Sequence, residues 1–167
     1  SLARRISASA GSPTRILSGG GQSVANPFPR YNTIDYVTTA STGNSTDFGN
    51  LSNAVQHPAA VSSSTRAAFG GGYDGTNVIN NIDYVSIAST GNASDFGDLS
   101  AAKFELMGTS NKIRGVFAGG FSSGTNGKTN EIEYITIATT GDVTDFGDLT
   151  AARSKSAACS SVHGGIA

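Results

Sequence analysis

The chain is poor in the residues that disulfide scaffolds, metal centres and membrane spans require. It has no tryptophan, one methionine and one cysteine, so Cys159 cannot form an intrachain disulfide. Its two histidines and single cysteine do not show the spacing of a zinc site. Apolar runs extend over only a few residues, which excludes a membrane-spanning helix.

Charge is scarce as well. Only 14% of the residues are charged and the formal net charge is -1. No basic surface is therefore available to bind nucleic acid or an anionic membrane through counterion release. We expect no nucleic-acid partner and no membrane insertion.

Glycine is the abundant residue. It accounts for 22 of the 167 residues, about twice its usual share. The length suits one domain with its own core, and the composition favours short strands and loops over helices. The sequence therefore predicts an all-β protein.

An internal repeat organises the chain. Residues 81–103 align with residues 131–153 at 13 of 23 positions, and residues 33–55 form a third copy. Upstream of each copy, an arginine opens a short apolar stretch that ends in a glycine cluster; these arginines are Arg15, Arg66 and Arg114. The period is about 50 residues.

Each repeat contains the pattern of four short strands. In the second unit these are residues 55–63, 66–71, 80–88 and 94–100. The third strand is apolar on both faces, so its sheet is predicted to lie between other sheets. Turns with a Thr-Gly-Asn or Thr-Gly-Asp sequence separate the last two strands, and we expect a positive φ at their glycines, Gly43, Gly91 and Gly141.

Four strands per 50 residues, repeated along the chain, predict the blades of a β-propeller, with a β-solenoid as the alternative. The whole chain, 1–167, is predicted to be one propeller segment. Its units span approximately 4–54, 55–102 and 103–152, followed by a partial unit at 153–167.

The units resemble the kelch repeat. Its glycine pair, tyrosine, second aromatic residue, leucine and basic residue correspond to Gly71, Gly72, Tyr84, Phe96, Leu99 and Lys103, and in the next unit to Gly119, Gly120, Tyr134, Phe146, Leu149 and Arg153. Phenylalanine replaces the usual kelch tryptophan, and twelve residues separate Tyr84 from Phe96, which is wider than in kelch repeats. The units are most similar to the degenerate TIDYxTIAxTGNxxDFGDLTxAR repeats of phage virion and tail structural proteins. This resemblance implies a kelch-like propeller with a structural role in a virion.

The two ends of the chain overlap in the repeat. Arg4 and Arg153 occupy the same position, and residues 150–167 correspond to residues 1–18. Three blades are too few for a propeller, so the chain is expected either to belong to a longer polypeptide or to close a ring with further copies. We expect 151–160 to form the innermost strand of a fourth blade, and the isolated chain to be unstable or oligomeric.

Three phenylalanines are expected to fill the space between blades. Phe48, Phe96 and Phe146 each follow the blade tyrosine by twelve residues. The neighbouring aspartates are predicted to cap turns, and the glycine clusters to pack backbone against backbone. Cys159 aligns with small residues of the other units and is expected to be buried.

The loops after the glycine clusters differ between repeats, at 22–32, 73–80 and 121–130. Variable loops on a constant scaffold are the usual place for recognition, although neutral drift of exposed loops would produce the same pattern. The candidate ligand-binding residues are Asn26, Phe28, Arg30, Tyr31, Tyr73, Asp74, Asn77, Phe121, Asn126 and Lys128.

Taken with the resemblance, these features predict a non-enzymatic structural or recognition module located in the virion, as a tail or capsid appendage. Its expected partners are other virion proteins, further copies of itself, and a host-surface glycan or protein. No catalytic residue, cofactor or metal is expected, because no cluster of His, Cys or carboxylate stands outside the repeat. The alternatives are a cellular kelch-type interaction propeller, extracellular or cytoplasmic, and a glycan-active propeller enzyme.

Overall fold

The computed structural model describes residues 3–160, and these residues form strands, turns and loops without any helix. No helix that could cross a membrane is therefore present in this range. The all-β prediction is confirmed.

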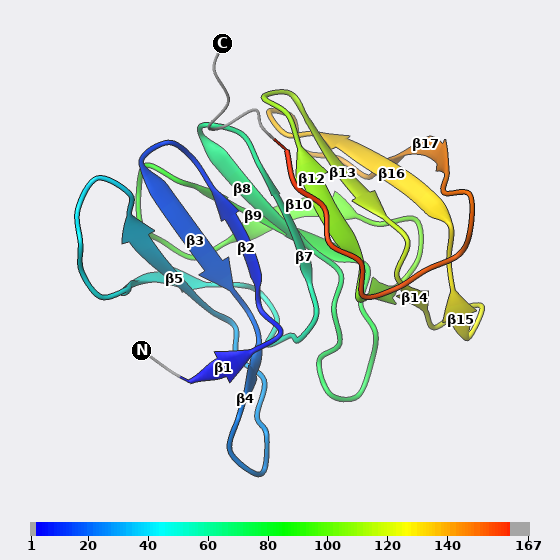
Figure 1. The fold of residues 1–167 in the computed structure, drawn as a ribbon, viewed down its shortest axis with the longest axis horizontal. Coiled ribbons are helices and arrows are strands. Elements are labelled where there is room, and N and C mark those ends of the chain that lie inside the picture. The colour runs from blue at the N-terminus through cyan, green and yellow to red at the C-terminus, as the bar shows by residue number, and fades with distance from the viewer. Residues whose placement is uncertain (1–2, 161–167) are drawn as a thin grey trace.

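Three four-stranded antiparallel sheets make up most of the chain (Figure 1). Sheet 1 contains β2 (Ala8–Gly11), β3 (Arg15–Gly19), β5 (Thr33–Thr38) and β6 (Thr46–Asn50). Sheet 2 contains β7 (Ala59–Ser62), β8 (Arg66–Gly70), β9 (Asn81–Ser86) and β10 (Ser94–Asp98). Sheet 3 contains β12 (Met107–Ser110), β13 (Arg114–Ala118), β16 (Glu131–Thr136) and β17 (Thr144–Asp148).

Each sheet draws its four strands from one repeat, and the strands are ordered as they follow one another along the chain. The prediction of four strands per repeat is confirmed. In every sheet the pairing of the third and fourth strands shifts by one residue at the phenylalanine; in sheet 2 this is Phe96, between Asp95 and Gly97. Such a bulge turns the strand and increases its twist.

Two smaller sheets lie at one end of the larger ones. One pairs β1 (Arg4–Arg5) with β4 (Gln22–Ser23). The other joins β11 (Lys103–Phe104), β14 (Phe121–Ser122) and β15 (Gly127–Lys128). Both sheets tie the loops that follow the glycine clusters to the start of a repeat.

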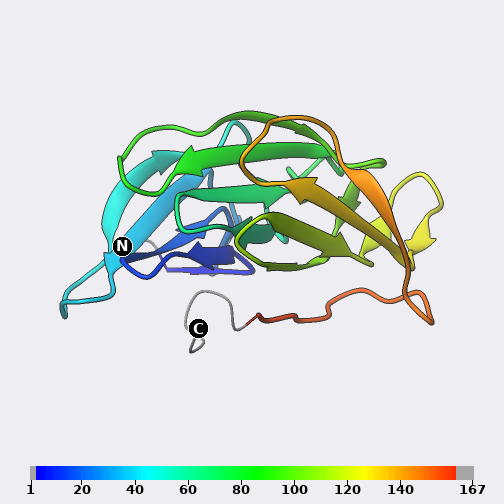
Figure 2. The ribbon, with the colours of Figure 1, turned by 90° about the horizontal axis from the view of Figure 1, so that it is seen from above.

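The three sheets stand side by side, with their first strands on one side and their last strands on the other (Figure 2). The inner strands β2 and β12 both lie against β7, and β12 is so close to β7 that a Cβ on Gly108 would collide with the carbonyl oxygen of Ala60. Hydroxyls link them: the Ser62 Oγ donates to the carbonyl oxygen of Gly11 at 2.7 Å, and the Ser62 N–H donates to the Ser110 Oγ at 3.1 Å.

Apolar side chains fill both spaces between neighbouring sheets. The face of sheet 1 toward sheet 2 contributes Leu17, Ile34 and Phe48, which pack with Phe69 and Ile87. The space between sheets 2 and 3 is filled by the equivalent set, Ala68, Ile82, Phe96, Phe117 and Ile137. Phe48 and Phe96 are each 2% exposed, as predicted for residues between blades.

The third phenylalanine departs from this pattern. Phe146 is 54% exposed, so the prediction that it is a core residue is wrong. It keeps the same edge-on contact with its tyrosine, Tyr134, at 5.9 Å between ring centroids, but no sheet of the described chain covers that face. The phenylalanine at this repeat position is therefore buried only where the sheet of the next repeat covers it.

Backbone contacts seal the same two spaces. The Gly91 N–H donates to the carbonyl oxygen of Phe48, and the Gly141 N–H to that of Phe96, both at 2.7 Å. A Cβ on Gly49 (φ 144°) or Gly97 (φ 143°) would collide with the carbonyl group of the incoming turn. Glycine is therefore required on the receiving strand.

The glycines of these turns differ from expectation. Only Gly141 has a positive φ, of 152°, and the predicted positive φ at Gly43 and Gly91 is wrong. These turns are wider than two-residue hairpins, so a left-handed residue is not needed to close them. The N–H groups of Gly91 and Gly141 donate hydrogen bonds to the preceding sheet.

Arginines add a third contact to each space. The Arg15 Nη1 donates to the carbonyl oxygen of Ile87 at 2.7 Å, and the Arg66 Nη1 to that of Ala138 at 2.8 Å. Both guanidinium groups lie 4.7 Å from the ring centroid of a tyrosine in their own sheet, Tyr36 or Tyr84. The ring holds the arginine extended toward the next sheet.

Residues 151–160 do not form a strand, so that prediction is wrong in its secondary structure. They nevertheless run along the inner strands in the register of a new repeat (Figure 2). The Gly120 N–H donates to the carbonyl oxygen of Arg153 as the Gly72 N–H does to that of Lys103. No second strand of the described chain pairs with this segment, which explains why it remains extended coil.

Burial of Phe96 between sheets 2 and 3 leads to a stability prediction. We expect Phe96→Ala to lower the free energy of unfolding by about 3 to 5 kcal/mol, because it removes a buried ring and leaves a cavity. The matched change Phe146→Ala should cost at most about 0.5 kcal/mol, since that ring is half exposed. Urea denaturation followed by circular dichroism measures both, and equal losses would contradict the assignment.

Candidate functional site

The three variable loops lie at the same end of the sheets, which we name the loop end (Figure 1). Each loop is closed by its own short ribbon. A bridge joins Gln22 to Arg30 in the first loop, another joins Tyr73 to Val78 in the second, and β14 pairs with β15 in the third. The structure thus holds three different loops in fixed positions on one surface.

A row of stacked side chains connects the loops. The Arg30 guanidinium lies 5.3 Å from the centroid of the Tyr73 ring, Tyr73 lies 6.2 Å from Phe104, and Phe104 lies 5.5 Å from Phe121. We name these four residues the loop row. They come from all three repeats, and each ring or cation contact contributes about 0.5 to 1.5 kcal/mol.

Arg30 has unused hydrogen-bonding capacity in this row. Its Nε is buried and has no hydrogen-bond partner in the described chain. Gly75 leaves room for the guanidinium, because a Cβ there would lie 2.8 Å from Nη1. The guanidinium is thus positioned by stacking on Tyr73 and by the space that Gly75 leaves.

Phe28 forms a separate feature at the tip of the first loop. Its ring is 39% exposed, and the Arg5 guanidinium lies 5.6 Å from its centroid. The Phe28 N–H donates to the carbonyl oxygen of Ala25 at 2.7 Å, which closes the tip. The loop presents an aromatic face to solvent.

Asp74 serves its own turn. Its carboxylate accepts hydrogen bonds from the backbone N–H groups of Asn77 and Thr76, both at 2.7 Å. These hydrogen bonds lower the pKa of Asp74, with the bond from Asn77 the larger cause. The carboxylate is therefore ionised at neutral pH and occupied by backbone donors, which makes it a poor general base.

The remaining candidates do not join the row. Tyr31 is held through its backbone: its N–H donates to the carbonyl oxygen of Gly21 in its own repeat, and its carbonyl oxygen accepts from the N–H of Val55 in the next repeat. Asn77 lies in the turn capped by Asp74. The side chains of the other three candidates, Asn26, Asn126 and Lys128, are exposed.

Sequence reasoning missed a recess of about 340 Å³ beside the loop row. It lies where the repeats begin and is lined by Ile6, Ser7, His57, Pro58, Glu105, Leu106, Lys155 and Ser156. His57 Nε2 is 3.9 Å from Glu105 Oε1, and Lys155 Nζ is 3.4 Å from the same oxygen. His57 also contacts the loop row, 6.1 Å from the Phe104 ring.

Four residues of this recess occupy one repeat position. Ile6, His57, Glu105 and Lys155 have φ values of 55°, 56°, 60° and 59°. Each N–H donates to the carbonyl oxygen of the preceding member, at 2.9, 3.2 and 3.0 Å along the series. Alignment of the repeats would have placed these four residues at one position, where the side chain changes from apolar to basic and acidic.

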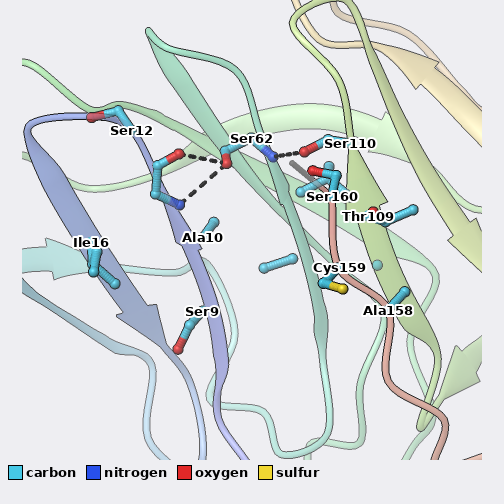
Figure 3. Close-up of a pocket in the computed structure, with 14 residues that line it drawn as sticks. Ser9, Ala10, Ser12, Ile16, Ser62, Thr109, Ser110, Ala158, Cys159 and Ser160 are labelled. Carbon is cyan, nitrogen blue, oxygen red and sulfur yellow. Dashed lines mark hydrogen bonds between the residues drawn. The ribbon is translucent and has the colours of Figure 1, made fainter. Parts of the chain in front are cut away.

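A second cavity, of about 290 Å³, lies between the inner strands (Figure 3). Small and hydroxyl side chains line it, including Ser9, Ser12 and Ser110. Cys159 lies at its edge and is exposed, so the prediction of a buried thiol is wrong. No sheet of the described chain covers the segment that carries this cysteine.

Among residues 3–160, no group of three or more His, Cys, Asp or Glu side chains is placed to hold a metal ion. No protein-family model matches the chain, and no curated protein is significantly similar to it. The geometry of the loop end is therefore the basis for any functional assignment.

Burial lowers the pKa of His57 below its usual 6.5, assisted by Lys155 and Arg5 and opposed by Glu105. A histidine with a lowered pKa in the folded state binds protons more readily when unfolded, so stability falls as the pH drops through about 6.5. We expect the melting temperature to decrease between pH 7.5 and 5.5, and to decrease less in His57→Gln. Differential scanning calorimetry measures this difference; identical pH dependence in both proteins would contradict it.

Proposed function

We propose that the three sheets are blades of a kelch-like β-propeller and that the chain is a non-enzymatic structural and recognition module of a phage virion, in a tail or capsid appendage. The resemblance of the repeats to those of virion proteins supports the location. The sheet packing supports the architecture, since each repeat forms one four-stranded antiparallel sheet whose inner strand lies beside that of its neighbour.

One observation carries the recognition role: the repeats keep the contacts between sheets alike while differing in the loops that they bring together. The Gly–Asx turn and the arginine contact recur in both spaces between sheets. The loops, by contrast, differ in length and side chains, yet they meet in the loop row. A rigid scaffold with divergent loops at one end is typical of binding modules.

The chemistry of the loop end suits a glycan on the host surface. The row offers aromatic rings and an arginine, side chains that are enriched at recognition surfaces. Phe28 adds an exposed ring, and Asn26, Asn77 and Asn126 add amide groups that both donate and accept hydrogen bonds. Uncharged sugar rings need stacking faces and paired donors and acceptors more than net charge.

Binding to an array of immobilised bacterial surface polysaccharides tests this proposal. We expect the full chain to bind a subset of them and Arg30→Ala to weaken that binding at least tenfold, which corresponds to about 1.4 kcal/mol. Arg114→Ala is the matched control, because Arg114 also stacks on a tyrosine, at 4.6 Å, but on sheet 3 outside the loop end. No bound polysaccharide, or equal losses in both variants, would contradict the proposal.

A further inference from the structure

The face of sheet 3 that points away from sheet 2 keeps the apolar pattern of a buried face. We name it the rear face; it consists of Val116, Ile132, Phe146 and Leu149. The equivalent residues of the other sheets are at most 4% exposed; they are Leu17, Ile34, Phe48 and Leu51 in sheet 1, and Ala68, Ile82, Phe96 and Leu99 in sheet 2. On the rear face, by contrast, Phe146 is 54% exposed.

The last strand of sheet 3 also keeps the polar groups that a following sheet would bind. In the two described spaces, the side chains of Asn92 and Asp142 accept hydrogen bonds from the backbone N–H groups of Asn50 and Asp98, each at 3.0 Å. Asp148 is the corresponding residue in β17. No turn of the described chain reaches it.

Gly147 supplies the space for such a turn. Like Gly49 and Gly97, it has a positive φ, of 131°. A Cβ on Gly49 or Gly97 would strike the neighbouring turn, whereas a Cβ on Gly147 would meet nothing within 4 Å. The last strand of sheet 3 therefore has the backbone shape that accepts a turn in the other two sheets, but no turn of the described residues lies against it.

Arg114 completes the set. Arg15 and Arg66 bind carbonyl oxygens of the following sheet, while Arg114 is stacked on Tyr134 in the same way and is exposed. Its guanidinium is thus held extended beside the rear face.

The opposite outer face, on sheet 1, does not match this face well. Sheets 2 and 3 insert a phenylalanine, Phe69 or Phe117, and an isoleucine, Ile87 or Ile137, into the space before them. Ser18 and Thr39 stand at these positions in sheet 1. Sheet 1 of a second copy would bring Ile16, which is 47% exposed, but neither the phenylalanine nor the isoleucine, so a second copy would cover Phe146 poorly.

The chain itself leads toward the rear face. Residues 153–160 already lie in the position of an inner strand, where Lys155 donates its N–H to Glu105 as Glu105 does to His57. A sheet built onto this strand would follow sheet 3 as sheet 3 follows sheet 2.

We propose that the rear face of sheet 3 is the docking site of a fourth sheet of the same repeat, joined in cis to residues 153–160. The sheet carries a Gly–Asn or Gly–Asp turn that binds Phe146 and Asp148, and a phenylalanine and an isoleucine that cover Phe146. This inference is independent of what the loop end binds, because it involves none of the loop row.

The proposal is tested with an extended chain, in which a second copy of residues 104–160 follows Arg153. The original 167-residue chain is measured for comparison. We expect Phe146→Asp to lower the melting temperature of the extended chain by about 10 °C, since it places a charge against a covered apolar face. In the original chain the same change should shift it by about 2 °C or less.

Ile113→Asp is the matched control, because Ile113 is 65% exposed in the turn between β12 and β13 and lies off the rear face. It should shift both chains equally and slightly. Equal effects of Phe146→Asp in the two chains would overturn the proposal. A dimer of the original chain in analytical ultracentrifugation, dissociated by Phe146→Asp, would overturn it in favour of a second copy.

Discussion

The contact between one sheet and the next is the interaction on which the rest of the structure depends. Three elements form it in both described cases: a buried phenylalanine, a turn whose glycine N–H binds that phenylalanine's carbonyl oxygen, and an arginine that spans the gap. None of these elements is complete within one repeat. A single repeat therefore has no full core, and stability comes from stacking of neighbours.

This contact also positions the candidate site. Because the sheets are locked at their outer strands by turns and at their inner strands by serine hydroxyls, the three variable loops cannot move apart independently. The loop row adds contacts between loops of different repeats. The result is a preorganised surface, on which little ordering would be required when a ligand binds.

Much of the fold follows from periodicity, because a repeat of 50 residues with four short apolar segments has few ways to bury them. The strands, their grouping by repeat and the burial of Phe48 and Phe96 could be predicted in this way. The exposure of Phe146 and Cys159 could not, since both depend on which neighbouring sheet is present. The recess of His57, Glu105 and Lys155 was missed because its members are 48 to 50 residues apart and unremarkable singly. Buried charges, such as Lys103 with Glu133 at 3.0 Å, also arise from three-dimensional contacts that no short motif reveals.

Hydrogen exchange at two glycine amides tests the central claim most directly. Gly43 and Gly91 sit in identical Ser-Thr-Gly-Asn sequences, but only the Gly91 N–H has a preceding sheet to bind in the described chain. In the native protein, nuclear magnetic resonance should show strong protection of Gly91 and exchange of Gly43 at nearly the rate of an unfolded peptide. Equal exchange rates at the two amides would show that the turns do not lock the sheets together.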